Sequence, residues 1–126
     1  MLANSKIHPT LPAVDLGRAR KFYEEKLGLE VLRTDPSPGV TFQDKSGAPA
    51  LYVYQRGATK ADHTVAAFEV EDIEAEVKEL KAKGVKFDVF DAPGVAWENE
   101  IAVMGSMKGA WFKDSEGNTL AVMYSG

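Results

Sequence analysis

Few side chains in this chain could do catalytic chemistry. Glu98 and Glu100 lie two residues apart and could act as a general acid and a general base, but paired loop carboxylates are more often solvated surface groups. Ser106 and Ser125 lack the sequence context of a nucleophile elbow. The chain has no cysteine, which excludes disulfides, thiolate metal ligands and a cysteine nucleophile. No catalytic motif is therefore recognisable.

The aromatic side chains of this chain suit ligand binding more than catalysis. Trp97, Trp111, Tyr52, Tyr54 and Phe42 could bury flat ligand rings by offset stacking. The formal net charge of -4 would attract cationic ligands. The same charge argues against nucleic-acid and membrane-surface partners, which would favour a basic face. We therefore expect a small-molecule partner, and neither nucleic acid nor membrane.

A repeat in the sequence predicts the elements that must position these side chains. The segments from Phe42 to Tyr54 and from Phe112 to Tyr124 carry Phe, Asp, Gly and Tyr at the same four places. A fixed order of residues that recurs indicates two copies of one supersecondary unit, each too small to bury its apolar face alone. The 126 residues are then a single domain of two modules, about 6–56 and 63–125. The surface between the modules is the natural place for a ligand.

Each copy is predicted to have the order β-α-β-β-β. Asp15 and Asp72 can cap the two helices, and Gly28 and Gly84 can end them in the left-handed conformation. Alternating apolar residues and turn residues place the strands. The first copy is then strand 6–14, helix 16–27 and strands 29–34, 39–44 and 50–55. The second copy is strand 64–70, a helix after Asp72, and strands 85–90, 107–113 and 118–124.

The copies differ by fourteen additional residues in the second, roughly within 91–106. Long irregular insertions in compact domains are usually functional or disordered, and the aromatic and apolar content here favours an ordered lid. Its Trp97 is a large apolar group in a polar stretch. We expect Trp97 to fold over a concave mouth and to face His8, Leu51, Val65 and Trp111. The alternative is that Trp97 anchors the insertion to the outer surface or to a neighbouring subunit.

Short motifs recur in order along residues 6–124. They are His8, Val14-Asp15-Leu16, Phe22-Tyr23 and Leu27-Gly28, then Phe68, Val70, Asp72, Gly84, Phe112-Lys113-Asp114 and Glu116-Gly117-Asn118. In these motifs the chain resembles the vicinal oxygen chelate superfamily, which includes glyoxalase I, bleomycin-resistance proteins, fosfomycin-resistance enzymes and extradiol dioxygenases. The resemblance implies an α+β fold of two tandem βαβββ modules, whose curved mixed sheets enclose a concave cavity. Dimers are common in the superfamily, so the resemblance also implies a homodimer.

Relatives that use a metal take its ligands from the first and last strand of each module. The resemblance places these positions at His8, Leu51, Val65 and Ala121, of which only His8 can bind a metal. We therefore expect no metal and no other cofactor, with His8 hydrogen-bonded at the rim of a pocket. An alternative is a rearranged site of His8 and His63 with Glu98 or Glu100.

The strand alternation divides the apolar residues between two faces. Phe68, Val70, Leu120 and Val122 would pack under the helices. The other face would form an apolar pocket, although the same side chains could instead fill a closed core. The expected pocket residues are His8, Phe42, Leu51, Val53, Val65, Ala67, Trp97, Trp111, Ala121 and Met123.

Two classes of function fit these patterns. The first is a metal-free binding protein similar to the bleomycin-resistance branch, which would sequester an aromatic, peptidic or cationic molecule. The alternative is an enzyme of the superfamily, a lyase, isomerase or dioxygenase, with a divergent or rearranged metal site. The N-terminal residues contain no apolar signal segment, and no apolar run approaches the length of a membrane span. The default expectation is a cytoplasmic location.

Overall fold

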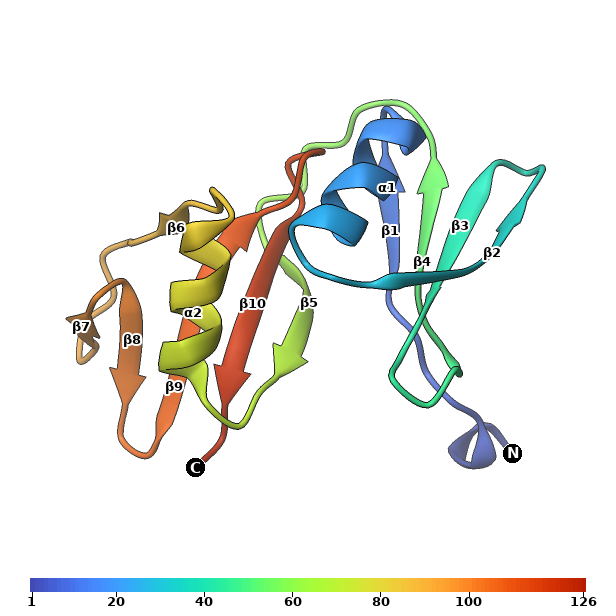
Figure 1. Ribbon diagram of the computed structural model, residues 1–126. Helices are drawn as coiled ribbons and strands as arrows, with labels where there is room; N and C mark the ends of the chain where they lie inside the picture. The colour runs from blue at the N-terminus through green and yellow to red at the C-terminus, as the bar shows by residue number, and fades with distance from the viewer. The chain divides into compact units, whose positions relative to one another are not determined.

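The chain forms two compact units, each with one α-helix and one mixed sheet. The computed structural model describes residues 1–126, and the units are Met1–Lys60 and Ala61–Gly126 (Figure 1). Both units follow the order strand, helix, then antiparallel strands. The predicted α+β fold of tandem βαβββ modules is therefore confirmed.

The first unit has a four-stranded sheet in the order β1-β4-β3-β2. β1 runs parallel to β4, and the other neighbours are antiparallel. Helix α1 contacts β3 and β4 and so covers one face of the sheet. The elements are the short 3-10 helix η1 (Leu2–Asn4), β1 (Thr10–Ala13), α1 (Leu16–Glu25), β2 (Glu30–Asp35), β3 (Gly39–Gln43) and β4 (Pro49–Gln55).

The second unit has a six-stranded sheet, with β5-β10-β9-β8-β7 in order and β6 also paired with β9. β5 and β10 are parallel, and the other pairs are antiparallel. Helix α2 contacts β9 and β10 and covers one face (Figure 1). The elements are β5 (Thr64–Glu69), α2 (Ile73–Ala82), β6 (Phe87–Asp88), β7 (Ala96–Glu98), β8 (Ile101–Met104), β9 (Met107–Lys113) and β10 (Thr119–Tyr124).

The helix boundaries follow from the predicted caps. The Asp15 carboxylate accepts the Arg18 backbone N–H at 3.0 Å, and the Asp72 carboxylate accepts that of Ala75 at 3.1 Å. These bonds satisfy donors that have no partner within the helix. Neither helix is long and apolar enough to cross a membrane.

The repeated turns have the same hydrogen-bond pattern in both units. The Asp44 carboxylate accepts backbone N–H groups from two and four residues further along, at 2.8 and 3.1 Å. The Asp114 carboxylate does the same at 2.8 and 2.9 Å. Gly47 and Gly117 then take φ values of 85° and 86°, which a residue with a Cβ adopts only at a cost. The sequence repeat therefore records a repeated structure.

The core of each unit lies between its helix and its sheet. In the first unit the Tyr23 ring of α1 contacts the Phe42 ring of β3, with centroids 5.5 Å apart and both residues fully buried. In the second unit Phe112 of β9 is buried against Phe87 of β6, with centroids 5.4 Å apart. Phe42 and Phe112 thus occupy equivalent positions, as the repeat predicts. We call the sheet face against the helix the helix face and the other the open face.

The last strands of the two units differ in register by one residue. An irregularity interrupts the β3–β4 pairing next to Phe42, which lies opposite Leu51. In the second unit Phe112 lies opposite Leu120, although equal spacing would place Ala121 there. Directly opposite residues of two strands point to the same face. Leu51 therefore corresponds in the sheet to Leu120, a helix-face residue.

This register corrects part of the predicted face assignment. Phe42 and Val53 lie on the helix face and are at most 1% exposed, so they do not line the open face as expected. Leu51 is also paired on the helix face, but beside the irregularity it still reaches the wall of the hollow that contains His8. Tyr52 and Tyr54 occupy the open face of β4 instead. The physical reason is the irregularity in the β3–β4 pairing, because one skipped residue exchanges the two faces of a strand.

The alternation predicted for β10, and for Ala67 and Phe68 of β5, is confirmed. Ala121 lies opposite Trp111 on the open face, and Met123 lies opposite Gly109 on the same face. Leu120 and Val122 share the helix face with Phe112. In β5, Phe68 is paired with Val122 and Ala67 with Ala121, which places them on the helix and open faces respectively. Val65 is the residue skipped between Thr64 and Ala66 at the irregular start of this pairing, so the register does not set its face.

The insertion at 91–106 is ordered, and much of it is a β-hairpin of β7 and β8. β6 pairs with one half of the β9 edge through Phe87 and Asp88. The chain then leaves the sheet, turns back through β7, and re-enters as β8 along the other half of the same edge. The inserted hairpin therefore extends the sheet sideways, because its polar backbone groups are satisfied by strand pairing.

We predict that Phe42→Ala lowers the free energy of unfolding by about 3–5 kcal/mol, because it leaves a cavity beneath α1. Denaturant unfolding followed by circular dichroism measures the change. The control Tyr54→Phe alters the open face of the same sheet and should cost no more than about 0.5 kcal/mol. Equal losses in the two variants would contradict the placement of Phe42.

Candidate functional site

The open face of the second unit carries a cluster of three aromatic rings. Phe90 lies with its ring centroid 5.2 Å from that of Trp97 and 5.1 Å from that of Trp111, and the two indoles are 6.2 Å apart. All three pairs are edge-to-face, the arrangement that ring quadrupoles favour. We call Phe90, Trp97 and Trp111 the aromatic surface. It brings together two predicted site residues, Trp97 and Trp111, the latter being one of the four residues that Trp97 was expected to face.

Strand pairing brings these rings together. Trp97 of β7 lies opposite Ala102 of β8, and Ala102 lies opposite Gly109 of β9. Trp111 is two residues beyond Gly109 on the same strand and therefore on the same face. The inserted hairpin is thus what carries Trp97 to the neighbourhood of Trp111.

Gly109 makes room for the Trp111 ring. A Cβ on this glycine would lie 2.9 Å from Met123 Sδ and 3.1 Å from Trp111 Cη2, closer than such atoms normally approach. Gly39 holds the equivalent position in the first unit, where a Cβ would collide with the Tyr52 ring. Each glycine precedes its repeated phenylalanine by three residues, a signal in the repeat that sequence reasoning missed.

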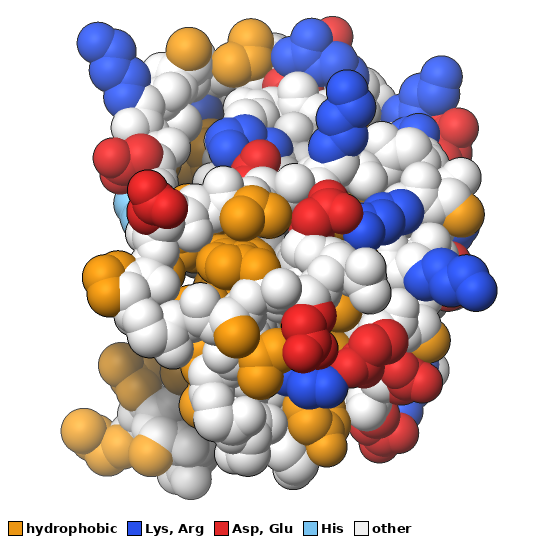
Figure 2. Space-filling view, turned by 90° about the vertical axis from the view of Figure 1, so that its left-hand side faces the viewer, with side chains coloured by type: hydrophobic (Ala, Val, Ile, Leu, Met, Phe, Trp, Pro, Cys, Tyr) orange, Lys and Arg blue, Asp and Glu red, His pale blue; other side chains and the backbone are white.

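Phe90 is a further member of the site that sequence reasoning missed. Its side chain is 48% exposed, an unusual state for a phenylalanine, and it closes the cluster between the two indoles. The available signal was its spacing of two residues from Asp88, just before the insertion, because residues two apart in a strand share a face. Figure 2 shows exposed hydrophobic side chains, with charged side chains around them, on the side of the molecule where β7 and β8 lie in Figure 1.

A hollow of about 410 Å³ adjoins the aromatic surface on the same open face. Lys113 Nζ lies 2.9 Å from Asp88 Oδ2 in its wall, and both groups are about half exposed. The hollow therefore combines aromatic surface with charged groups of both signs. Its lining residues are Asp62, His63, Thr64, Asp88, Phe90, Trp111, Lys113 and Thr119.

The open face of the first unit has a more polar hollow of about 310 Å³, which includes His8. The Tyr52 hydroxyl lies 3.0 Å from Ser37 Oγ and 3.4 Å from Asp35 Oδ1. The Ser37 hydroxyl also donates to Asp35 and, with its backbone N–H and Tyr52, lowers the pKa of that carboxyl. The hollow is lined by His8, Thr10, Arg33, Asp35, Thr41, Pro49, Leu51 and Tyr52. The predicted position of His8 at a pocket rim agrees with this lining.

The residues do not form the superfamily's metal-binding pattern. Of the four positions that the resemblance gives for metal ligands, only His8 has a side chain that can bind a metal. Leu51, at another of them, lies on the helix face. The open-face residue that corresponds to Ala121 is Tyr52, since each lies opposite the equivalent residue of the preceding strand. A phenol and an imidazole in one unit do not make the usual three- or four-ligand set.

Within the second unit, neither glutamate of the rearranged metal site is directed toward His63. Glu98 lies opposite Ile101 and points away from the face of Trp97, and the Glu100 carboxylate binds Lys81 at 2.6 Å. His63 lines the hollow on the open face. No group of three or more histidine, aspartate or glutamate side chains is placed to hold a metal ion.

The family of the chain follows from its sequence. It matches the Glyoxalase/Bleomycin resistance protein/Dioxygenase superfamily over residues 7–122, so the chain belongs to this superfamily. No curated protein sequence matches it. The solved structure of UcmS2 is similar at 24% identity, with a TM-score of 0.68, over 92% of this chain and 94% of that one.

Two further solved structures share the fold. The integron cassette protein HFX_CASS4, from the mobile metagenome of the Halifax Harbour sewage outfall, is 19% identical with a TM-score of 0.72 and coverage of 97% and 99%. The fosfomycin resistance protein FosX from Listeria monocytogenes is 15% identical with a TM-score of 0.71 and coverage of 98% and 92%. A FosX variant was solved with Mn(II) and 1S,2S-dihydroxypropylphosphonic acid. At these identities the likeness shows the fold.

We predict that Ser37→Ala raises the pKa of Asp35, because the Ser37 hydroxyl makes the largest contribution to lowering it. Tyr52→Phe should raise the same pKa less. A carboxyl with a lowered folded-state pKa contributes stability above its unfolded pKa and loses it as the pH falls through the folded value. NMR titration of the Asp35 carboxyl carbon measures both variants, and an unchanged midpoint in Ser37→Ala would contradict the hydrogen bond.

Proposed function

We propose that this protein binds a small, flat, aromatic cation on the open face of its second unit, without a metal ion. The observation that carries the proposal is the aromatic surface, whose rings lie beside a hollow of about 410 Å³. Two indoles and a phenyl ring offer both edges and faces to a planar ligand. Sequestration of such a molecule is the resulting function.

The preference for a cation comes from two features of the same face. Indole faces attract cations through the ring quadrupole. The hollow is also lined by the carboxylates of Asp62 and Asp88, whereas Lys113, which pairs with Asp88, is the only lysine in its lining. The net charge of -4 adds a general attraction for cations.

The pocket residues expected from the sequence are revised in this proposal. Trp97 and Trp111 form the binding surface together with Phe90, and Ala121 and Met123 lie on the same open face. Ala121 is small, so the indole of Trp111 opposite it has space on that side. We retain Val65, which is skipped at the irregular start of the β5–β10 pairing, as a residue of the proposed site. We leave out Phe42 and Val53, which are buried on the helix face, and Leu51, which belongs to the hollow of the first unit.

We predict that acridine orange, a planar aromatic cation, binds the protein and quenches its tryptophan fluorescence. Trp111→Ala should weaken binding by about tenfold, since a stacked ring contributes about 0.5–1.5 kcal/mol beyond its burial. Tyr54→Ala removes a ring from the open face of the first unit and serves as the matched control, with less than about a twofold effect expected.

Two outcomes would overturn the proposal. One is binding of the dye with no change in the fluorescence of either single-tryptophan variant, Trp97→Phe or Trp111→Phe. The other is a loss of affinity in Tyr54→Ala as large as that in Trp111→Ala. If Trp97→Ala leaves dye binding intact and changes only the sedimentation of the protein, Trp97 belongs to a subunit contact.

We predict that divalent metal ions bind no better than millimolar, because Leu51, Val65 and Ala121 offer no ligand atoms beside His8. Calorimetric titration with Zn²⁺, Ni²⁺, Mn²⁺ and Fe²⁺ measures this directly. One tight site per chain that disappears in His8→Ala would refute the prediction and favour a metal-dependent enzyme of the superfamily.

A further inference from the structure

Lys81 lies on helix α2, against the sheet face opposite to the aromatic surface, yet it is tied to the hairpin that carries Trp97. We propose that Lys81 is a positioning residue, which fixes the turn between β7 and β8 and thereby holds Trp97 in place for ligand binding. This inference rests on the proposed function for its effect on affinity. Its effect on Trp97 itself is independent of any ligand.

The turn is one that the chain does not favour by itself. Glu98 and Ile101 are paired, so Asn99 and Glu100 form a two-residue connection. Both residues have positive φ, 51° and 69° respectively. Two-residue hairpins of this type prefer Asn-Gly, because a Cβ at positive φ is strained. Asn99 suits its position, but Glu100 stands where glycine is preferred, and so an external contact is needed to hold the turn.

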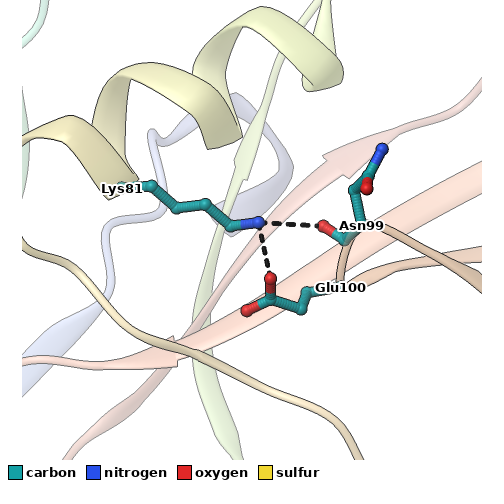
Figure 3. A network of polar contacts seen from close by, with 3 residues as sticks. All are labelled: Lys81, Asn99 and Glu100. Carbon is teal, nitrogen blue, oxygen red and sulfur yellow. Dashed lines mark hydrogen bonds and ion pairs between the residues drawn. The ribbon is translucent and has the colours of Figure 1, made fainter.

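Lys81 supplies that contact through two bonds from one ammonium group. Its Nζ donates to the Asn99 carbonyl oxygen at 3.2 Å and to Glu100 Oε1 at 2.6 Å (Figure 3). The Lys81 and Glu100 side chains are 35% and 41% exposed, so water screens the ion pair in part. The two bonds nevertheless involve both residues with positive φ. Lys81 therefore restrains both the backbone of the turn, at Asn99, and the side chain of Glu100.

The turn is coupled to the aromatic surface by a short path. Trp97 is one residue before Glu98, which forms the last pair before the turn. β7 has only three residues and a single neighbouring strand, and so few other bonds hold it. On the helix side, Ile101 and Val77 line a groove of about 340 Å³ between α2 and the hairpin, and both are nearly fully buried. These apolar contacts anchor β8, which leaves Lys81 as the tie to the turn itself.

The test uses full-length protein labelled with 5-fluorotryptophan and read by ¹⁹F NMR, with Trp97→Phe and Trp111→Phe assigning the two signals. In Lys81→Met we expect the Trp97 signal to shift or broaden, while the Trp111 signal changes less. Acridine orange should bind about threefold to fivefold more weakly, the effect of losing one partly exposed ion pair. Lys81→Arg keeps the charge and the donors and should restore most of both.

Lys78→Met is the matched control. Lys78 lies on the same helix and lines the same groove, but the bonds to the turn come from Lys81. Lys78→Met makes the same change in charge and should leave the Trp97 signal and dye affinity unchanged. In a Glu100→Gly background the turn becomes Asn-Gly, so Lys81→Met should then perturb Trp97 less than it does in the native background.

An unchanged Trp97 signal in folded Lys81→Met, or an equal change in Lys78→Met, would overturn the proposal. If Lys81→Met fails to fold, Glu100→Gln tests the same carboxylate bond by the same signal. Failure of the wild-type protein to bind dye would refute the proposed function, whereas the ¹⁹F comparison would still decide whether Lys81 positions Trp97.

Discussion

Each sheet has two faces, while each unit has one α-helix to cover them. Burial of Phe42 beneath α1 and of Phe112 on the helix face of the second sheet stabilises each unit, because removing apolar surface from water is the dominant favourable contribution to folding. The single helix of each unit thus covers only one face of its sheet. The open faces are left with rings and polar groups that the core does not need, and both hollows that contain histidine lie on them.

Each open face has an aromatic ring that lies across a glycine, but the surroundings of the ring differ between the two units. In each, a glycine three residues before the buried phenylalanine lets a neighbouring ring lie across the strand. In the first unit the ring is Tyr52, on the last strand, and its hydroxyl bonds Ser37 and Asp35. In the second unit the ring is Trp111, on the strand before, and it meets other rings. The two units thus share the space for a ring and differ in what surrounds it, so one hollow is more polar and the other adjoins aromatic rings.

The sequence repeat was sufficient to predict the fold, since caps, turn glycines and buried phenylalanines recur in fixed order and each acts locally. It could not predict the faces of β4, because the irregularity beside Phe42 is set by pairing between strands and has no local marker. Extrapolation from Ala121 therefore placed Leu51 on the wrong face. The partnership of Trp97 and Trp111 was predictable in outline from the position of the insertion. The part played by Phe90 was not, because it depends on where the chain leaves the sheet.

The way in which the insertion joins the sheet explains why the second unit could gain an aromatic surface without loss of its fold. β6 satisfies one half of the β9 edge and β8 satisfies the other, so β9 keeps pairing at both ends while the chain between them is free to lengthen. The new edge is β7, and three residues make it too short to offer a long template for another chain. A strand so short has little stability of its own. The position of Trp97 therefore depends on contacts from outside the strand, and the bonds from Lys81 to the turn are contacts of this kind.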